Sequence, residues 1–214
     1  MIELFQEITL PESDITEGMS GANDGKSEYK YYLTLVSNGL RIKTGDTVYL
    51  FRKDDDKHPN HKSLKRKPKS ESLSEESKSD YIIFRVQHLM INKEGRKLVY
   101  GHHYLRPSET YHEPSRKFYV NEVLRSPLNE WVPIEEVKGL CCVLDPNTYC
   151  KGRPKGFKEE DVYICEMRTD RNAKSFNKIS KQNQFFINTK SYAFDMFAKK
   201  LSIKRTYSVI ILFI

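Results

Sequence analysis

The sequence predicts a mainly β fold followed by a short helical extension at its C-terminal end. Short runs rich in β-branched and aromatic residues recur along the chain between turn-forming residues, which is the pattern of β-strands. Before position 171, no window of about eleven residues carries the apolar stripe of an amphipathic helix. Residues 191–204 do carry one, because Phe194, Phe197, Ala198 and Leu201 follow the spacing of one helix face.

The first elements are a flexible leader and a strand-turn-strand unit. Residues 1–28 include "TEGMSGANDGKSE", a mixture of Gly, Ser, Asn and Asp with almost nothing apolar to bury, so we expect a flexible leader. Apolar residues return over positions 28–52. There "SNGL" and "KTGD" provide turns before the strand "TVYLF".

Residues 53–80 are almost wholly polar and of low complexity, and strands flank them on both sides. We therefore expect a long disordered insertion between two β-strands. The insertion contains the basic run "HKSLKRKPK", which is a candidate nuclear-localisation patch or phosphate contact. A solvated loop is the alternative. The candidate localisation residues are Lys65, Arg66, Lys67 and Lys69.

Three later segments complete the predicted β-core. Residues 81–105 contain two β-rich runs joined at "KEG", which predicts a hairpin. Residues 139–145, "GLCCVLD", and residues 161–168, "DVYICEMR", are each expected to form a short strand.

The C-terminal extension, residues 171–214, carries the positive charge of the chain. The net charge of the whole sequence is +7, yet residues 171–205 hold nine Lys or Arg against the single acid Asp195. Repeated cations in one segment supply phosphate partners, so we expect sequence-independent contact with duplex DNA. A solvated packing extension is the alternative. The candidate DNA-binding residues are Arg171, Lys174, Lys178, Lys181, Lys190, Lys199, Lys200, Lys204 and Arg205.

Composition argues against several other classes of protein. The 214 residues suit one domain with appendages, and no run approaches the roughly 20 apolar residues that a membrane span needs. The four cysteines form no CxxC pair and the six histidines give no zinc spacing, so we expect buried thiols and no metal or other cofactor. No nucleophile elbow or phosphate-cradling glycine loop is present, so we expect a binding module and no enzyme.

The densest motif is "YLRPSETYHEPSRKFYVNEVLRS", residues 104–126. Together with "GDTVYLF" (45–51), "FRVQHLM" (84–90) and the two closing strands, it resembles the bromo-adjacent homology (BAH) domain family over residues 29–170. Within that family the chain is most similar to the domains of polybromo, of the yeast chromatin remodellers and of absent-small-homeotic-type histone methyltransferases.

The resemblance implies a twisted, partly open β-barrel core with irregular loops, in a nuclear module cut from a larger chromatin regulator. Some members of the family read methylated lysine through an aromatic cage, which works by cation–π attraction. The matching positions here are Ile82 or Tyr81, then His103 and Leu105, so the cage lacks several aromatic faces. A shift of register could rebuild it. The candidate histone-peptide residues are Tyr81, Tyr100, His103 and Tyr104.

Within the central motif we expect most residues to serve as scaffold. Pro107 and Pro114 fix the backbone of a rigid turn, and Glu109, Glu113 and Glu122 are interleaved with Arg106, Arg116 and Lys117 for mutual pairing. Phe118, Tyr119 and Val123 are expected to pack beneath. The sequence thus predicts a module that binds nucleosomal DNA, and through its β-core a histone tail or a complex subunit. The alternatives are a protein–protein scaffold without DNA contact and a methyl-lysine reader.

Overall fold

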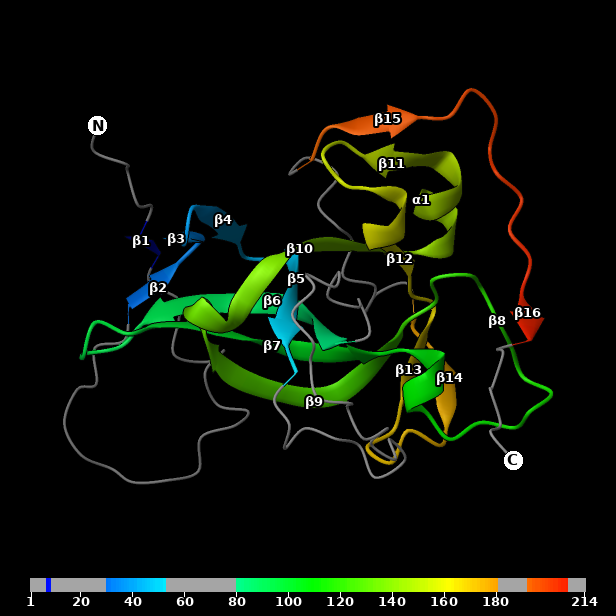
Figure 1. Ribbon diagram of the computed structural model, residues 1–214, viewed down its shortest axis with the longest axis horizontal. Coiled ribbons are helices and arrows are strands. Elements are labelled where there is room, and N and C mark those ends of the chain that lie inside the picture. The colour runs from blue at the N-terminus through cyan, green and yellow to red at the C-terminus, as the bar shows by residue number, and fades with distance from the viewer. Residues whose placement is uncertain (1–6, 9–29, 53–79, 181–191, 208–214) are drawn as a thin grey trace, which may run out of the picture.

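The computed structural model describes residues 7–8, 30–52, 80–180 and 192–207 (Figure 1). The leader expected over residues 1–28 and the insertion expected over 53–80 lie outside these residues, apart from residues 7–8 and Asp80. The candidate localisation residues Lys65, Arg66, Lys67 and Lys69 also lie outside them.

A twisted sheet forms the centre of the described fold, in the order β12-β10-β5-β6-β7-β9-β13-β14. Its strands pair antiparallel except for β10 with β12 and β9 with β13, which run parallel. The mainly β prediction is confirmed. The strands are β5 (Thr47–Phe51), β6 (Tyr81–Ile91), β7 (Lys97–Leu105), β9 (Leu124–Pro133), β10 (Val137–Leu144), β12 (Val162–Ile164), β13 (Met167–Thr169) and β14 (Phe176–Lys178), with β2 (Lys30–Tyr32) paired to β6 and β1 (Glu7–Ile8) paired to β2.

The sheet curls part of the way back on itself. Residues 121–123, which lead into β9, exchange backbone hydrogen bonds with Ile164 of β12: Ile164 donates to Asn121 over 3.0 Å, and Val123 donates to Ile164 over 2.8 Å. β12, at one end of the sheet, therefore meets the segment that leads into β9, near the other end. This contact makes the sheet a partly open barrel.

The turn residues act as the sequence predicts. Asn38 and Gly39 join β3 (Thr34–Ser37) to β4 (Leu40–Lys43) with positive φ angles of 51° and 75°. A two-residue hairpin turn with positive φ at both positions matches the twist of the flanking strands, and an Asn-Gly pair tolerates it. The hairpin expected at "KEG" joins β6 to β7.

Three clusters of buried side chains make up the core. The largest lies between β3, β4 and one face of the sheet, and includes Leu35, Ile42, Val48, Phe84 and Ile134. The second, around Tyr49, Tyr104 and Tyr163, lies on the other face. The third surrounds α1 (Pro146–Lys151), a helix that the sequence analysis missed because it is too short to show a periodic stripe. Asp145 caps this helix by accepting from the backbone nitrogens of Asn147 and Thr148.

The strand expected over residues 161–168 is broken in two. Its first part, β12, pairs with β10, and its second part, β13, pairs with β9 and β14. Cys165 and Glu166 separate the two parts. A continuous apolar pattern could not reveal that the chain leaves one sheet neighbour and joins another.

The prediction of a helix over residues 191–204 is wrong. Residues 192–207, here called the strap, are extended: β15 (Phe194–Met196) pairs with β11 (Gly152–Pro154), and β16 (Thr206–Tyr207) pairs with β8 (Lys117–Phe118). Backbone partners on two edge strands decide against the helix. A Cβ at Gly152 would lie 2.4 Å from the Asp195 carbonyl oxygen, so this glycine permits the close approach of the strap.

Candidate functional site

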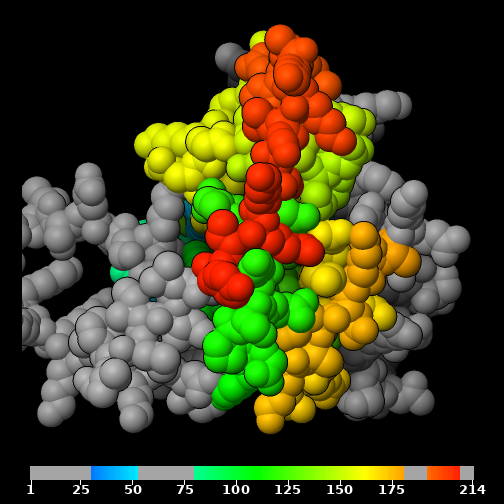
Figure 2. Space-filling model, turned by 90° about the vertical axis from the view of Figure 1, so that its right-hand side faces the viewer, coloured from blue at the N-terminus to red at the C-terminus, as the bar shows by residue number. Residues whose placement is uncertain are grey.

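The strap and the β13–β14 hairpin lie on one face of the molecule. Figure 2 shows the strap in red running down this face, with the β8 region in green and the hairpin in yellow and orange beside its lower end. Backbone hydrogen bonds hold the upper strap to the α1–β11 segment, from Leu201 to Cys150 and from Phe197 to Lys151, each over 2.9 Å. The guanidinium of Arg153 lies between the rings of Tyr149 and Phe197. The strap is therefore an integral part of the fold.

Most of the predicted cations on this face point outward. Lys199, Lys200 and Lys204 are exposed along the strap, and Arg171 and Lys174 are exposed at the β13–β14 turn. Lys200 reaches the side-chain oxygen of Asn147 over 3.1 Å. Lys181 and Lys190 lie outside the described residues. The structure thus brings five of the nine candidate residues to one side of the molecule as solvent-exposed charges.

Two of the nine form ion pairs with carboxylates: the half-buried Arg205, and Lys178, whose own side chain is exposed. The guanidinium of Arg205 lies 2.5 Å from Glu166 and 3.7 Å from Glu122, and it stacks over Tyr119. Lys178 lies 2.7 Å from the same Glu166. Burial alone raises the pKa of Glu166, but Lys178 and Arg205 outweigh it and hold that pKa below its usual value. Arg205 is consequently a structural cation.

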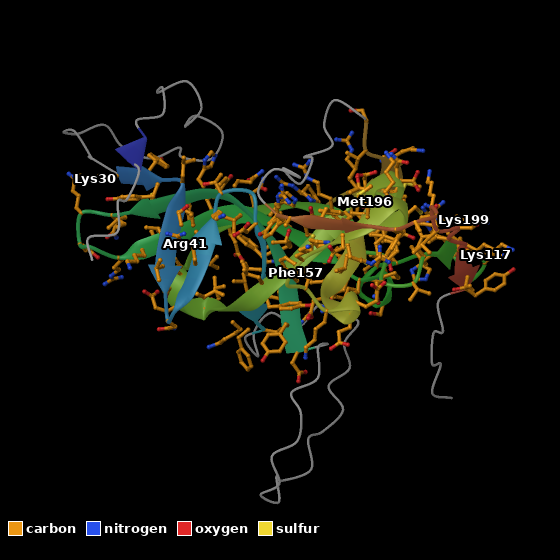
Figure 3. The ribbon with its side chains drawn as sticks, turned by 90° about the horizontal axis from the view of Figure 1, so that it is seen from above. Lys30, Arg41, Lys117, Phe157, Met196 and Lys199 are labelled. Carbon is orange, nitrogen blue, oxygen red and sulfur yellow. The ribbon has the colours of Figure 1, made fainter. Side chains whose placement is uncertain are left out.

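The sequence analysis missed two cations of this face, Arg116 and Lys117. The Lys117 ammonium lies 4.6 Å from the ring centroid of Tyr207, and the Arg116 guanidinium lies 4.0 Å from that of Phe176. Figure 3 shows Lys117 at the same end of the molecule as Lys199. The basic run "SRK" could have indicated a phosphate contact. These residues were instead expected to pair with carboxylates of their own loop.

Only two of the four candidate peptide-binding side chains, Tyr81 and Tyr104, pack in the same buried cluster. Tyr104 is buried beside His102, whereas Tyr81 packs on Tyr49 with ring centroids 5.8 Å apart. His103 lies near Phe84 and 2.7 Å from Glu130. Side chains alternate between the faces of a strand, so neighbours on β7 cannot share a cage.

Tyr100, the fourth of them, instead joins an aromatic row that the sequence analysis did not find. The row crosses four strands, from Tyr31 on β2 through His88 on β6 and Tyr100 on β7 to Trp131 on β9. Successive ring centroids are 6.3, 5.8 and 4.8 Å apart, and all four side chains are half-buried. The sequence shows only one of these aromatic residues on each strand. Their alignment into a row depends on the register between the strands.

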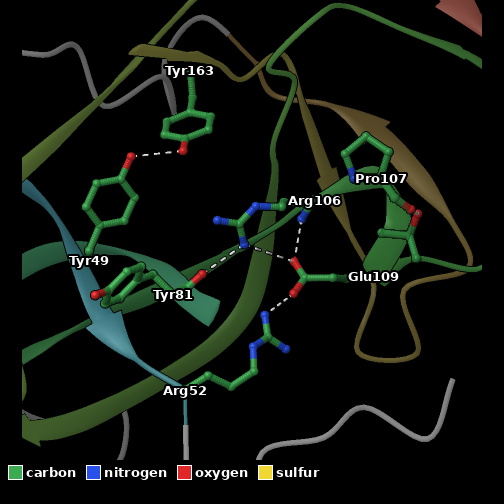
Figure 4. A network of polar contacts seen from close by, with 8 residues as sticks. Tyr49, Arg52, Tyr81, Arg106, Pro107, Glu109 and Tyr163 are labelled. Atoms are coloured by element: carbon green, nitrogen blue, oxygen red, sulfur yellow. Dashed lines mark hydrogen bonds and ion pairs between the residues drawn. The ribbon is translucent and has the colours of Figure 1, made fainter. Parts of the chain in front are cut away.

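The central motif serves as scaffold, as expected (Figure 4). Glu109 is buried and accepts from the Arg52 guanidinium and, over 2.7 Å, from the backbone nitrogen of Arg106. Arg106 in turn donates to the Tyr81 carbonyl over 2.9 Å. The predicted partners were partly wrong, because Arg52, which is distant in the sequence, pairs with Glu109, and Arg205 pairs with Glu122.

A second polar network lies above the first in Figure 4. The hydroxyls of Tyr49 and Tyr163 are 2.9 Å apart, and Tyr49 also donates to Asp161 over 2.8 Å. Burial raises the pKa of the Tyr49 hydroxyl, so it remains a protonated donor.

The cysteines are buried, as the sequence predicts. All four are free and buried, and burial raises the pKa of the Cys142 and Cys165 thiols to about 12. Such thiols stay protonated near neutral pH and act as small apolar side chains. The described residues hold no cluster of ligands for a metal ion, and none of their helices is long and apolar enough to cross a membrane.

The motif and the mainly β fold agree with comparisons to known proteins. The BAH domain family model matches residues 40–180, two thirds of the chain. The chain belongs to the BAH domain family. The matched region extends past residue 170, where the core was expected to end, and this agrees with the pairing of β14 in the sheet.

Three relatives illustrate the similarity of this BAH domain. It is 44% identical over 182 residues to the histone-lysine N-methyltransferase ash1 of Drosophila melanogaster, covering 84% of this chain and 8% of that protein. It is 41% identical over 76 residues to the chromatin structure-remodeling complex subunit rsc1 of Schizosaccharomyces pombe, covering 36% of this chain and 10% of that protein. The crystal structure of the yeast Rsc2 BAH domain matches with a TM-score of 0.56 at 22% identity, over 78% of this chain and 62% of that one.

The chain thus spans about a tenth of the length of the curated relatives it matches. It is a nuclear, chromatin-associated module without catalytic function of its own.

Proposed function

We propose that this BAH domain docks a multidomain chromatin regulator, of the kind that ash1 represents, onto nucleosomes. The basic face contacts nucleosomal DNA, and the β-core contacts a histone tail or a subunit of the same complex. The observation that carries the proposal is the line of exposed cations on one face. Lys199, Lys200 and Lys204 follow the strap, with Lys117 beside its lower end.

The extended backbone of the strap suits contact with DNA phosphates. A strap that is held at both ends by strand pairing presents its lysines at fixed places, so little order has to be gained on binding. Each cation that neutralises a phosphate releases counterions, which makes the affinity sequence-independent and strongly dependent on salt. No described element has the shape of a recognition helix for the major groove, so base reading is not part of the proposal.

The aromatic row favours a second candidate function, a protein–protein scaffold without DNA contact. Four half-buried rings across β2, β6, β7 and β9 offer apolar and π surface to a partner. A methyl-lysine cage built from Tyr81, Tyr100, His103 and Tyr104 is not proposed, because Tyr100 and His103 have other neighbours than the cluster in which Tyr81 and Tyr104 pack.

The test compares two double variants of equal charge change. Lys199→Glu with Lys204→Glu alters the strap, whereas Arg41→Glu with Lys93→Glu alters exposed cations on β4 and in the β6–β7 turn. Figure 3 shows Arg41 far from Lys199, and Figure 1 shows the β6–β7 turn at the end of the sheet opposite the strap. Binding to nucleosomes and to free DNA is measured over a range of salt concentrations. The strap variant should weaken binding about tenfold or more and lower the salt slope by about 2, while the control should keep both.

Two design features keep this test interpretable. Arg205 is left intact, because a glutamate there would face Glu122 and Glu166. Truncation at residue 170 is avoided, because Ile179 is part of the core and would be lost. If the unmodified chain itself shows no salt-dependent binding to DNA, the scaffold function without DNA contact replaces the proposal. If the unmodified chain binds DNA and both double variants bind it equally well, the strap lysines are not the contact and the proposal fails.

A further inference from the structure

A cavity of about 570 Å³ lies between β9, β13 and β14, and its lining is rich in hydrogen-bond donors. Its lining includes none of the strap lysines and no member of the aromatic row. Its hydrogen-bond donors include the side chains of Arg125, Ser126, Asn129, Arg168, Asn177 and Ser180.

Strand register aligns three of these side chains. Arg168 of β13 pairs with Arg125 of β9 on one side and with Asn177 of β14 on the other. Paired residues on adjacent strands point to the same face, and adjacent strands lie about 4.8 Å apart. Two guanidiniums and an amide therefore form a short row along the cavity, with half-buried Arg125 deeper than exposed Arg168.

Like charges directly opposite each other on a sheet are unfavourable unless something compensates. Burial lowers the pKa of Arg125, and repulsion by Arg168 and Arg85 lowers it further, against opposing effects of Tyr104 and Cys165. Within the described residues, no carboxylate forms an ion pair with Arg168. Arg168 thus carries a positive charge that an anion in the cavity would balance.

The other two charged side chains of the lining, Lys178 and Asp170, have partners outside this row. The Lys178 ammonium lies 2.7 Å from Glu166, outside the row. Asp170 is the one carboxylate among the lining residues, and one of its oxygens accepts from the backbone nitrogens of Lys174 and Ser175 over 2.8 and 3.1 Å. Its charge is therefore partly satisfied within its own turn.

We propose that this cavity binds a phosphorylated serine or threonine side chain of an extended peptide. Paired guanidiniums bind phosphate through bidentate, charge-assisted hydrogen bonds, and Asn177, Asn129 and Ser126 add neutral donors. A phosphate carries nearly two negative charges near neutral pH, which matches two arginines better than a single carboxylate does.

The recessed position favours a peptide over duplex DNA. A phosphate at the tip of a side chain can reach half-buried Arg125, whereas the phosphates of a stiff duplex meet protruding cations such as those of the strap. The last strand of the sheet also provides a place for peptide backbone. In the described part of the chain no further strand pairs with the outer edge of β14, and such an edge accepts an added strand.

The experiment uses the full 214-residue chain and four probes: a Gly- and Ala-rich peptide with one central phosphoserine, its unphosphorylated counterpart, inorganic phosphate, and a short DNA duplex. Amide chemical shifts report the site, and titration reports affinity. The phosphopeptide should shift the amides of Ser126, Asn129 and Asn177, bind at least about tenfold more tightly than its counterpart, and be displaced by inorganic phosphate.

Matched variants localise the effect. Arg168→Gln should reduce phosphopeptide affinity about tenfold, and Arg125→Lys, which keeps the charge but loses the planar fork, should also weaken it. Arg171→Gln removes an exposed cation that does not line the cavity and should leave affinity unchanged. The strap variant Lys199→Glu with Lys204→Glu should also retain phosphopeptide binding, so failure of the DNA proposal and failure of this one are distinguishable.

Three results would overturn the inference. The first is equal binding of the phosphorylated and unphosphorylated peptides. The second is an unchanged affinity of Arg168→Gln. The third is a DNA duplex that shifts the same amides and competes with the phosphopeptide, which would assign the cavity to nucleic acid.

Discussion

The guanidinium of Arg205 lies 2.5 Å from the carboxylate of Glu166, although the two residues are 39 positions apart in the sequence. The pair joins the lower strap to the segment between β12 and β13, and the buried Glu122 lies 3.7 Å from the same guanidinium. A positive charge that composition assigns to nucleic-acid binding thus stabilises the fold. The face proposed to contact DNA is built from its exposed neighbours.

Removing Arg205 should therefore destabilise the protein. Arg205→Ala leaves Glu122 buried without its nearby cation and should lower the free energy of unfolding by about 1–3 kcal/mol. Denaturation by urea, followed by circular dichroism, measures the change. Lys204→Ala, at the exposed neighbouring position, should shift it by less than about 0.5 kcal/mol. Equal effects of the two substitutions would show that the Arg205 ion pairs contribute nothing to stability.

Glu109 should matter as much through its charge as through its shape. Glu109→Gln keeps the size of the side chain but turns an amide donor toward the Arg52 guanidinium, and we expect a loss of about 2–4 kcal/mol. The exposed Glu113 is the matched control, and Glu113→Gln should be nearly neutral. Thermal or urea denaturation of both variants decides the point. A neutral Glu109→Gln would mean that the network is satisfied by shape alone.

Gly101 on β7 should tolerate no side chain. A Cβ at this position would lie 1.7 Å from the carbonyl oxygen of Arg85 and 2.7 Å from the Phe84 ring, so Gly101→Ala must force β6 and β7 apart. We expect a loss of more than about 3 kcal/mol or failure to fold.

Gly139 on β10 provides the comparison for Gly101. The nearest atom to its added Cβ is a ring carbon of Tyr49 at 3.9 Å, so Gly139→Ala should cost less than about 1 kcal/mol. Soluble yield and the urea midpoint measure both variants. If Gly101→Ala proves as stable as Gly139→Ala, the β6–β7 register described above is incorrect.

His102 should make the stability of the fold depend on pH. Burial, followed by the nearby Arg125 and Arg85, lowers the pKa of its imidazole from 6.5 to about 3. Between pH 6.5 and about pH 3, His102 is therefore protonated in the unfolded chain but neutral in the folded chain. The free energy of unfolding consequently decreases as the pH falls below 6.5. The loss from this one group is up to about 1.4 kcal/mol per pH unit.

A difference measurement isolates this histidine from other titrating groups. Burial raises the pKa of Asp46 and of Glu122, which opposes the loss of stability in acid. Urea midpoints of the unmodified chain and of His102→Phe are therefore compared at pH 7 and pH 5. The phenylalanine variant should show the smaller loss on acidification, and parallel losses in the two proteins would contradict the assignment.

Local sequence was sufficient for much of the sheet. The Asn38–Gly39 turn, the β6–β7 hairpin and the strand β5 follow from turn chemistry and from runs of β-forming residues, which act over a few positions. The burial of the four cysteines follows equally from their apolar surroundings. These features need no knowledge of the partner strands.

The candidate sites were harder to predict, because each depends on register between distant strands. Tyr31, His88, Tyr100 and Trp131 become one row only when β2, β6, β7 and β9 are aligned. Arg125, Arg168 and Asn177 likewise meet across β9, β13 and β14. A shift of one residue would send either set to the other face, and periodicity within a single segment carries no information on such a shift.

The sequence by itself determined a mainly β binding module of the BAH family with a basic C-terminal segment. Only the tertiary structure decided that this segment is an extended strap, that Arg205 lies inward while Lys199 and Lys204 lie outward, and that two arginines share one cavity. The reason is physical. Residues 191–204 carry a helical pattern, but backbone hydrogen bonds to β11 and β8 supply an alternative to the helix, and those partners lie far away in the chain.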